Sequence, residues 1–202
     1  SCKKIKVSFK KMDLNQSINF LTKELNLLKK KNKKISEIIN VIGNTILDNK
    51  KVYICGNGGS AADSQHFATE FIVRLRGSVN RKSYPLISLI QDVSTITACA
   101  NDYSFEKIFS RNLQAFGQKG DLLIVLSTSG KSKNIIKVLK EANKMKISKI
   151  GFFGNRGGLA SKYCDHDIST NISNTARIQE CQKFLLHFIL EKVEDNLIKA
   201  KF

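Results

Sequence analysis

Apolar residues recur with a helical period through the first quarter of the chain. Two sets of apolar positions, spaced mainly by three and four residues, carry this pattern: Ile18, Leu21, Leu25 and Leu28, then Ile35, Ile38, Ile39, Ile42 and Ile46. The period predicts helix over residues 13–49 in two successive segments, with a bend at the lysine-rich run 29–34. The apolar face suggests packing against another subunit, although packing within the chain is equally allowed.

From residue 51 the pattern changes to short apolar runs, each followed by a polar or glycine-containing turn and a helical pattern. These runs are Lys51–Cys55, Pro85–Ile90, Asp121–Leu126, Lys149–Phe153 and Asp167–Thr170. Runs of this kind are typical of parallel strands covered on both faces. They predict an α/β fold with a doubly wound, flavodoxin-like, five-stranded parallel sheet, closed by a long amphipathic helix over about 175–199.

The 202 residues contain no repeat, linker or low-complexity tract. We therefore expect one domain over 1–202, with a helical extension at about 13–49 and a sheet core at about 51–202. No apolar run reaches the roughly 18 residues that a membrane span needs, and the first residues lack the apolar stretch of a secretory signal. Five widely spaced cysteines without a C-x-x-C pair indicate free thiols, so we expect a cytoplasmic protein.

The net charge of +17 is of the size seen in nucleic-acid-binding proteins. The charge is almost all lysine, however, and neither an arginine-rich patch nor interleaved aromatic residues for base stacking accompany it. We interpret it as a lysine-rich solvated surface that also attracts an anionic substrate, and we do not expect a nucleic-acid partner.

The segment 55–62, which reads CGNGGSAA, lies between the first predicted strand and its helix. Its glycines let the backbone approach a ligand and present N–H groups at a helix N-terminus, where anions bind. The spacing Gly56-x-Gly58-x-x-Ala61 also matches a dinucleotide fingerprint, but the acid expected about 20 residues further on is missing. A tight turn without a ligand is the remaining alternative.

A second polar loop, Ser127-Thr-Ser-Gly-Lys-Ser132, follows the third predicted strand and precedes a helix expected at 134–146. Four hydroxyl groups in six residues at a helix start can surround a phosphate monoester together with backbone N–H groups. A helix cap alone needs a single Ser or Thr. The loop therefore predicts a phosphate site, and its spacing is not that of a Walker loop.

Together these loops resemble a sugar isomerase (SIS) domain, and five motifs in order narrow the resemblance to the phosphoheptose isomerase family. The motifs are CGNGGSAADSQHFATE at 55–70, ANDY at 100–103, FSR at 109–111, STSGKS at 127–132 and TARIQE at 175–180. The similarity extends from about residue 18. It implies a homotetramer with one zinc ion per subunit. The implied reaction converts D-sedoheptulose 7-phosphate into D-glycero-D-manno-heptose 7-phosphate through an enediolate, for bacterial lipopolysaccharide or capsule synthesis.

The resemblance implies a metal site made of His66, Glu70, Gln179 and His187. His66 and Glu70 are neighbours on one helix face. Gln179 and His187 are eight residues apart, about 12 Å along a helix, so they share an ion only if both lean inward or if a neighbouring subunit supplies one of them. Without the resemblance, His187 reads as a core histidine.

The resemblance also implies the substrate-binding residues. They are Asn57, Gly58, Gly59 and Ser60 along the ligand, Ser127, Thr128, Ser129 and Ser132 around the phosphate, and Asn101, Asp102 and Gln179 at the sugar hydroxyls, with Glu70 also at the substrate. We assign Glu70 as the base that moves the proton and His187 as the acid that also helps to open the sugar ring. Arg74 either steadies the site or pairs on the surface, Asp102 is equally a helix cap, and His166 reads as a turn or strand-edge residue.

Two other functional classes share features with this sequence. Replication-initiator-associating SIS proteins are tetrameric binding modules without known chemistry, and they resemble this chain in fold and most motifs. As a group they lack the glutamate at position 70 and the histidine at position 187, and both are present here. SIS enzymes for hexose or amino-sugar phosphates are not expected to carry the four metal-binding residues.

Overall fold

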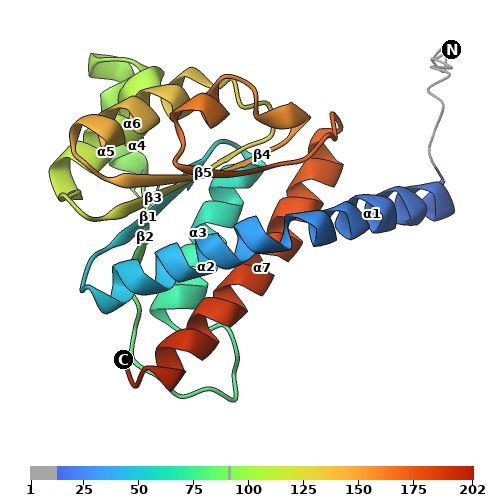
Figure 1. Ribbon diagram of the computed structural model, residues 1–202. Helices are drawn as coiled ribbons and strands as arrows, with labels where there is room; N and C mark the ends of the chain where they lie inside the picture. The colour runs from blue at the N-terminus through green and yellow to red at the C-terminus, as the bar shows by residue number, and fades with distance from the viewer. Residues whose placement is uncertain (1–12, 91) are drawn as a thin grey trace, which may run out of the picture.

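The computed structural model describes residues 13–90 and 92–202 (Figure 1). Its N-terminal part consists of α1 (Leu14–Leu28) and α2 (Asn32–Leu47), joined by the short 3₁₀ helix η1 (Lys29–Lys31). The two helices and the irregular turn at the lysine-rich run confirm the prediction from apolar spacing. Asp13 begins α1 by accepting a hydrogen bond from the backbone N–H of Gln16, whose side chain in turn accepts one from the Asp13 N–H.

Five parallel strands form one sheet. They are β1 (Val52–Gly56), β2 (Leu86–Ser88), β3 (Leu122–Ser127), β4 (Ser148–Phe153) and β5 (His166–Ser169). Their spatial order is β2-β1-β3-β4-β5, which is the flavodoxin-like order and confirms the predicted fold class. The strand predicted at 85–90 is shorter than expected: its pairing with β1 ends at Ser88, and the N–H of Leu89 makes the last bond of this ladder, to the carbonyl of Ile54.

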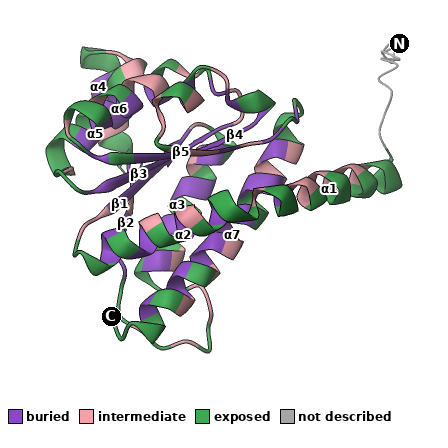
Figure 2. Ribbon diagram, in the orientation of Figure 1, coloured by how far each residue is buried: buried purple, intermediate pink, exposed green. Residues whose placement is uncertain are grey.

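Helices cover both faces of the sheet. Five α-helices follow β1 in the chain: α3 (Gly59–Ile72), α4 (Val93–Asp102), α5 (Ile108–Phe116), α6 (Lys133–Lys144) and α7 (Thr175–Lys199). Three short 3₁₀ helices, η2 (Phe105–Lys107), η3 (Asn155–Gly157) and η4 (Ala160–Tyr163), lie between them. Helices α2, α3 and α7 pack on one face, while α4, α5 and α6 pack on the other. Their sheet-facing sides are the buried sides in Figure 2.

Alternation along the strands divides the core in two. Val52 and Ile54 belong to the cluster under α2, α3 and α7, whereas Tyr53 and Cys55 belong to the cluster on the opposite face. This is the period of two that a strand buried on both faces requires. The four cysteines in the described part of the chain, Cys55, Cys99, Cys164 and Cys181, are free, and Cys2 lies outside it.

None of the helices described by the structure combines the length and the apolar character needed to cross a bilayer.

Candidate functional site

A pocket of about 260 Å³ opens beyond the carboxyl ends of β1 and β3. These two strands are neighbours, and the chain leaves them toward opposite faces of the sheet, so the pocket lies at the topological switch point where such folds bind ligands. Ten residues line it: Asn57, Gly58, Gly59, Ser60, Leu126, Ser127, Thr128, Ser132, Thr175 and Gln179.

The N-terminal ends of three helices meet at this pocket. Gly58 is the N-cap of α3, Ser132 is the N-cap of α6, and Thr175 is the first residue of α7. Neither the α3 nor the α6 N-terminus receives a cap hydrogen bond from its N-cap side chain. Three positive dipole ends and uncapped N–H groups make the pocket suited to a phosphate group.

The loop after β1 is held open by a reciprocal pair of amides. The Asn57 side chain donates to Asn134 at 2.9 Å and accepts from it at 2.8 Å, and Asn134 is buried at the start of α6. Gly58 has φ +56°, a conformation that suits glycine, and a Cβ on Gly59 would lie 2.5 Å from Nε2 of Gln179. The Gln179 amide therefore rests against Gly59 and closes one side of the pocket.

Eight of the predicted substrate-binding residues line this pocket: Asn57, Gly58, Gly59, Ser60, Ser127, Thr128, Ser132 and Gln179. Ser129 does not line it; its hydroxyl accepts a hydrogen bond from the N–H of Lys131. The sequence reasoning missed Thr175 and Leu126, as well as Asn134 behind Asn57. The hydroxyl that opens the TARIQE motif and the asparagine just after the STSGKS loop were the available signals.

Asn101 and Asp102 lie elsewhere in the chain. Both side chains are exposed at the C-terminal end of α4, where Asn101 donates to Asp102 at 2.9 Å. The alternative that Asp102 caps a helix is wrong, because Asp102 is the last residue of α4 and the next two helices have Ser104 and Lys107 as their N-caps. Neither lines the pocket, so a contact of Asn101 or Asp102 with substrate stays a prediction.

Three of the four predicted metal ligands gather where α3 runs beside α7. His66 Nε2 lies 3.2 Å from His187 Nε2 and 3.4 Å from Oε1 of Glu70. Zn–N bonds of about 2.0–2.1 Å in a tetrahedral site separate two ligand atoms by about 3.3 Å, so both distances suit zinc. Two imidazoles and a carboxylate are also a donor set that zinc accepts.

Gln179 does not join this group in the single chain. Its amide rests on Gly59, seven residues and about 10 Å of helix before His66. The inward lean that would bring Gln179 and His187 to one ion is therefore not adopted here. Within the described residues of one chain, no three His, Cys, Asp or Glu side chains enclose a metal position. The donor chemistry fits zinc, but the single chain presents an incomplete site.

The environment of His187 favours its neutral form. Burial lowers the pKa of His187, the adjacent His66 lowers it further, and the Glu70 carboxylate opposes both effects. A neutral imidazole is the form that binds a metal or accepts a proton.

Two further predicted positions have simple locations. Arg74 is exposed just past the end of α3, so it does not extend the helix face that carries Glu70. His166 is the first residue of β5, which is an edge strand, as its sequence context predicted.

Comparison with known proteins places the chain in a class. Residues 18–154 match the SIS domain family, to which the chain belongs. A phosphoheptose isomerase from Campylobacter concisus is 43% identical over 84% of this chain and 94% of its own length. One from Clostridium acetobutylicum is 42% identical, with 83% and 84% covered. Within the SIS domain family, the chain is a member of the phosphoheptose isomerases.

Solved structures agree with this placement. A phosphoheptose isomerase from Francisella tularensis has a TM-score of 0.80 at 28% identity, covering 91% of this chain and 100% of that one. The enzyme from Neisseria gonorrhoeae has a TM-score of 0.78 at 30% identity, with the same coverage.

Proposed function

We propose that this protein is a sedoheptulose-7-phosphate isomerase that forms D-glycero-D-manno-heptose 7-phosphate for bacterial heptose synthesis. The observation that carries the proposal is a spatial division along α3 and α7. A hydroxyl-lined pocket at three helix N-termini lies at one end, and His66, Glu70 and His187 lie two helical turns away. A seven-carbon sugar with phosphate on its last carbon needs its two ends recognised at separate places.

The phosphate end belongs in the pocket. Ser127, Thr128 and Ser132 supply hydroxyl donors there, and the N-termini of α3, α6 and α7 supply a positive potential. This arrangement needs no lysine in the pocket, and among its described lining residues there is none.

The carbonyl end belongs at the histidine–glutamate cluster. Neutral His187 accepts the proton of the anomeric hydroxyl as the ring C–O bond breaks, and it returns that proton to the ring oxygen. Glu70 then removes a proton from C1 of the open-chain ketose to give the enediolate and delivers it to C2. His187 moves the hydroxyl proton from O1 to O2, so that the products balance.

A zinc ion bound by His66, Glu70 and His187 would supply Lewis-acid stabilisation of the negative charge on O1 and O2, and ligand exchange during turnover would free Glu70 and His187 to carry protons. We propose Gln179, in another rotamer, or a residue of a neighbouring subunit as the fourth ligand.

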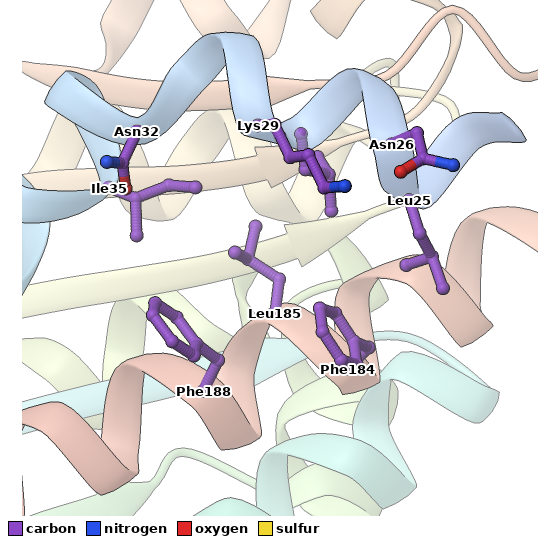
Figure 3. A pocket seen from close by; sticks show the side chains of 9 residues that line it. Leu25, Asn26, Lys29, Asn32, Ile35, Phe184, Leu185 and Phe188 are labelled. Carbon is purple, nitrogen blue, oxygen red and sulfur yellow. The ribbon is translucent and has the colours of Figure 1, made fainter. Parts of the chain in front are cut away.

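We further propose that the enzyme works in the cytoplasm as a homotetramer joined through its N-terminal helices. An apolar groove of about 250 Å³ between these helices and α7 supports this assembly (Figure 3). Phe184 beside the groove is 53% exposed, and Leu14 and Ile18 on α1 are 74% and 52% exposed. A set of large apolar side chains on one face is a mark of an interface.

The direct test is incubation of the purified protein with sedoheptulose 7-phosphate, with and without a chelator, followed by separation of the two sugar phosphates. We expect conversion that is lost with the chelator and restored by zinc. Glu70→Gln should reduce kcat at least about a hundredfold, because the amide cannot take the C1 proton. His187→Ala should do the same, and both variants should retain the wild-type circular dichroism spectrum. Near-normal turnover by either variant would contradict its assigned role.

A further inference from the structure

Helices α3 and α7 run parallel, and side chains meet across them in steps. Gln179 lies against Gly59 at the N-terminal ends, and His187 meets His66 about two turns further along. Between these two contacts lies a third, in which Nζ of Lys183 is 3.0 Å from Oδ1 of Asp63. Gln179, Lys183 and His187 are spaced by four residues each, so they share one face of α7.

The middle contact differs from an ordinary surface ion pair. The Asp63 side chain is only 10% exposed, so its carboxylate is fixed inside the seam, the line of contact between α3 and α7. The Lys183 side chain is 53% exposed and reaches solvent. An ammonium group has three hydrogens, and Asp63 holds one side of it. The His66 side chain, at the next contact along the two helices, is 46% exposed, so both residues reach solvent.

We propose that Lys183 is a substrate-binding residue that donates hydrogen bonds to hydroxyl groups in the middle of the bound, open-chain sugar phosphate. This inference rests on the proposed function, because that function puts phosphate at the Gln179 end and the reacting carbons at the His187 end. Gln179 and His187 are eight positions apart, about 12 Å of helix, and an extended seven-carbon chain that joins the two ends along α7 passes Lys183. Asp63 is then a positioning residue, because it acts by holding the ammonium group.

The assignment also gives Lys183 a part in selecting chain length. A shorter sugar phosphate held in the same pocket does not extend its carbonyl carbon as far along α7 as His187. The Lys183 ammonium group therefore favours binding of sugar phosphates whose carbon chain continues past it. It takes no part in proton transfer.

The test is steady-state kinetics of Lys183→Met with sedoheptulose 7-phosphate, together with competitive inhibition by inorganic phosphate. Methionine keeps the apolar stem and removes the charge and the donors. We expect KM to rise about tenfold, because the variant loses one or two hydrogen bonds from a charged group, and kcat to change less. The inhibition constant of phosphate should stay within about twofold, because phosphate fills only the distant pocket. Lys183→Arg should recover part of the loss.

The matched control is Lys192→Met, which removes another α7 lysine paired with an aspartate, Asp195 at 3.3 Å, beyond the seam. It should leave KM and kcat unchanged. An unchanged KM in Lys183→Met, with active wild-type enzyme, would overturn the role of Lys183 and leave the isomerase intact. An equal rise in KM and in the phosphate inhibition constant would also overturn it, because the effect would then be general electrostatics. Wild-type protein without turnover would overturn the proposed function and this inference together.

Discussion

At the scale of single residues, position 59 requires glycine because of a neighbouring side chain. A Cβ there would lie 2.5 Å from Nε2 and 3.0 Å from Cδ of Gln179, while the backbone itself is in an ordinary conformation. Gly59→Ala should therefore push the Gln179 amide away from the pocket and raise KM about tenfold. It should change the free energy of unfolding by less than about 1 kcal/mol, because the amide is the far end of a flexible side chain.

Kinetics and urea unfolding of the same preparation separate these two effects. Gly77→Ala is the matched control, because an added Cβ at Gly77 meets no described atom within 4 Å. A KM that does not change in Gly59→Ala would show that the position of Gln179 is unimportant for substrate binding.

The sequence predicted the pocket residues because their chemistry is local. Glycines after a strand and hydroxyl groups before a helix predict anion-binding loops from their order in the chain. The loops at 57–60 and 127–132 do meet at one pocket. Asn134 and Thr175 were missed because their roles depend on a partner far away in the chain. Asn134 matters through Asn57, 77 residues earlier, and Thr175 through the place where α7 begins.

At the scale of elements, a buried ion network fixes α3 against α7. Glu194 in α7 is 1% exposed and accepts from Nε of Arg76 at 2.6 Å and from Nε of Arg81 at 2.7 Å. The Arg81 guanidinium also donates to the backbone carbonyls of Glu70 and Phe71 in the last turn of α3. One arginine thus binds the end of the helix that carries Glu70 and the helix that carries His187.

Arg81→Met should lower the free energy of unfolding by about 3 kcal/mol, because it leaves buried carbonyls and half of a buried carboxylate without a donor. Urea denaturation measures the loss. Lys144→Met, which removes an exposed partner of Glu141, is the control and should cost less than about 1 kcal/mol. Equal stability of the two variants would mean that the network does not hold the helices together.

The elements themselves followed from the spacing of apolar residues, while their contacts did not. Runs buried on both faces predicted all five strands, and the period of 3.6 predicted α1, α2 and α7. The step-by-step pairing of α3 with α7 could not be predicted, because it depends on the angle and register at which two helices pack. The sequence assigned Gln179 both to the substrate and to the metal site; the structure places it in the lining of the pocket beyond β1 and β3, and its part in metal binding stays a prediction.

At the scale of the whole molecule, the order of the strands determines where the pocket lies. The exposure of the N-terminal helices bears on a question that the sequence left open. The apolar period of 13–49 was compatible with packing within the chain or against another subunit. The structure answers differently for the two helices. Ile38, Ile42 and Ile46 of α2 are fully buried in the core, whereas Leu14 and Ile18 of α1 face solvent. Figure 1 shows α1 extending past the body of the molecule.

The face formed by α1, α2 and α7 around the groove in Figure 3 should therefore control the oligomeric state. Phe184→Glu places a charge beside the groove, where burial against a second chain would leave it unpaired. We expect light scattering after size exclusion to show the proposed tetramer for the wild-type protein and a smaller assembly for Phe184→Glu at equal concentration. Phe116→Glu is the matched control, because Phe116 is 59% exposed at the end of α5, on the other side of the sheet. A tetramer that persists in Phe184→Glu, or that is lost equally in Phe116→Glu, would place the interface elsewhere.

If the metal site is completed between subunits, the zinc content per chain should fall with the loss of the tetramer.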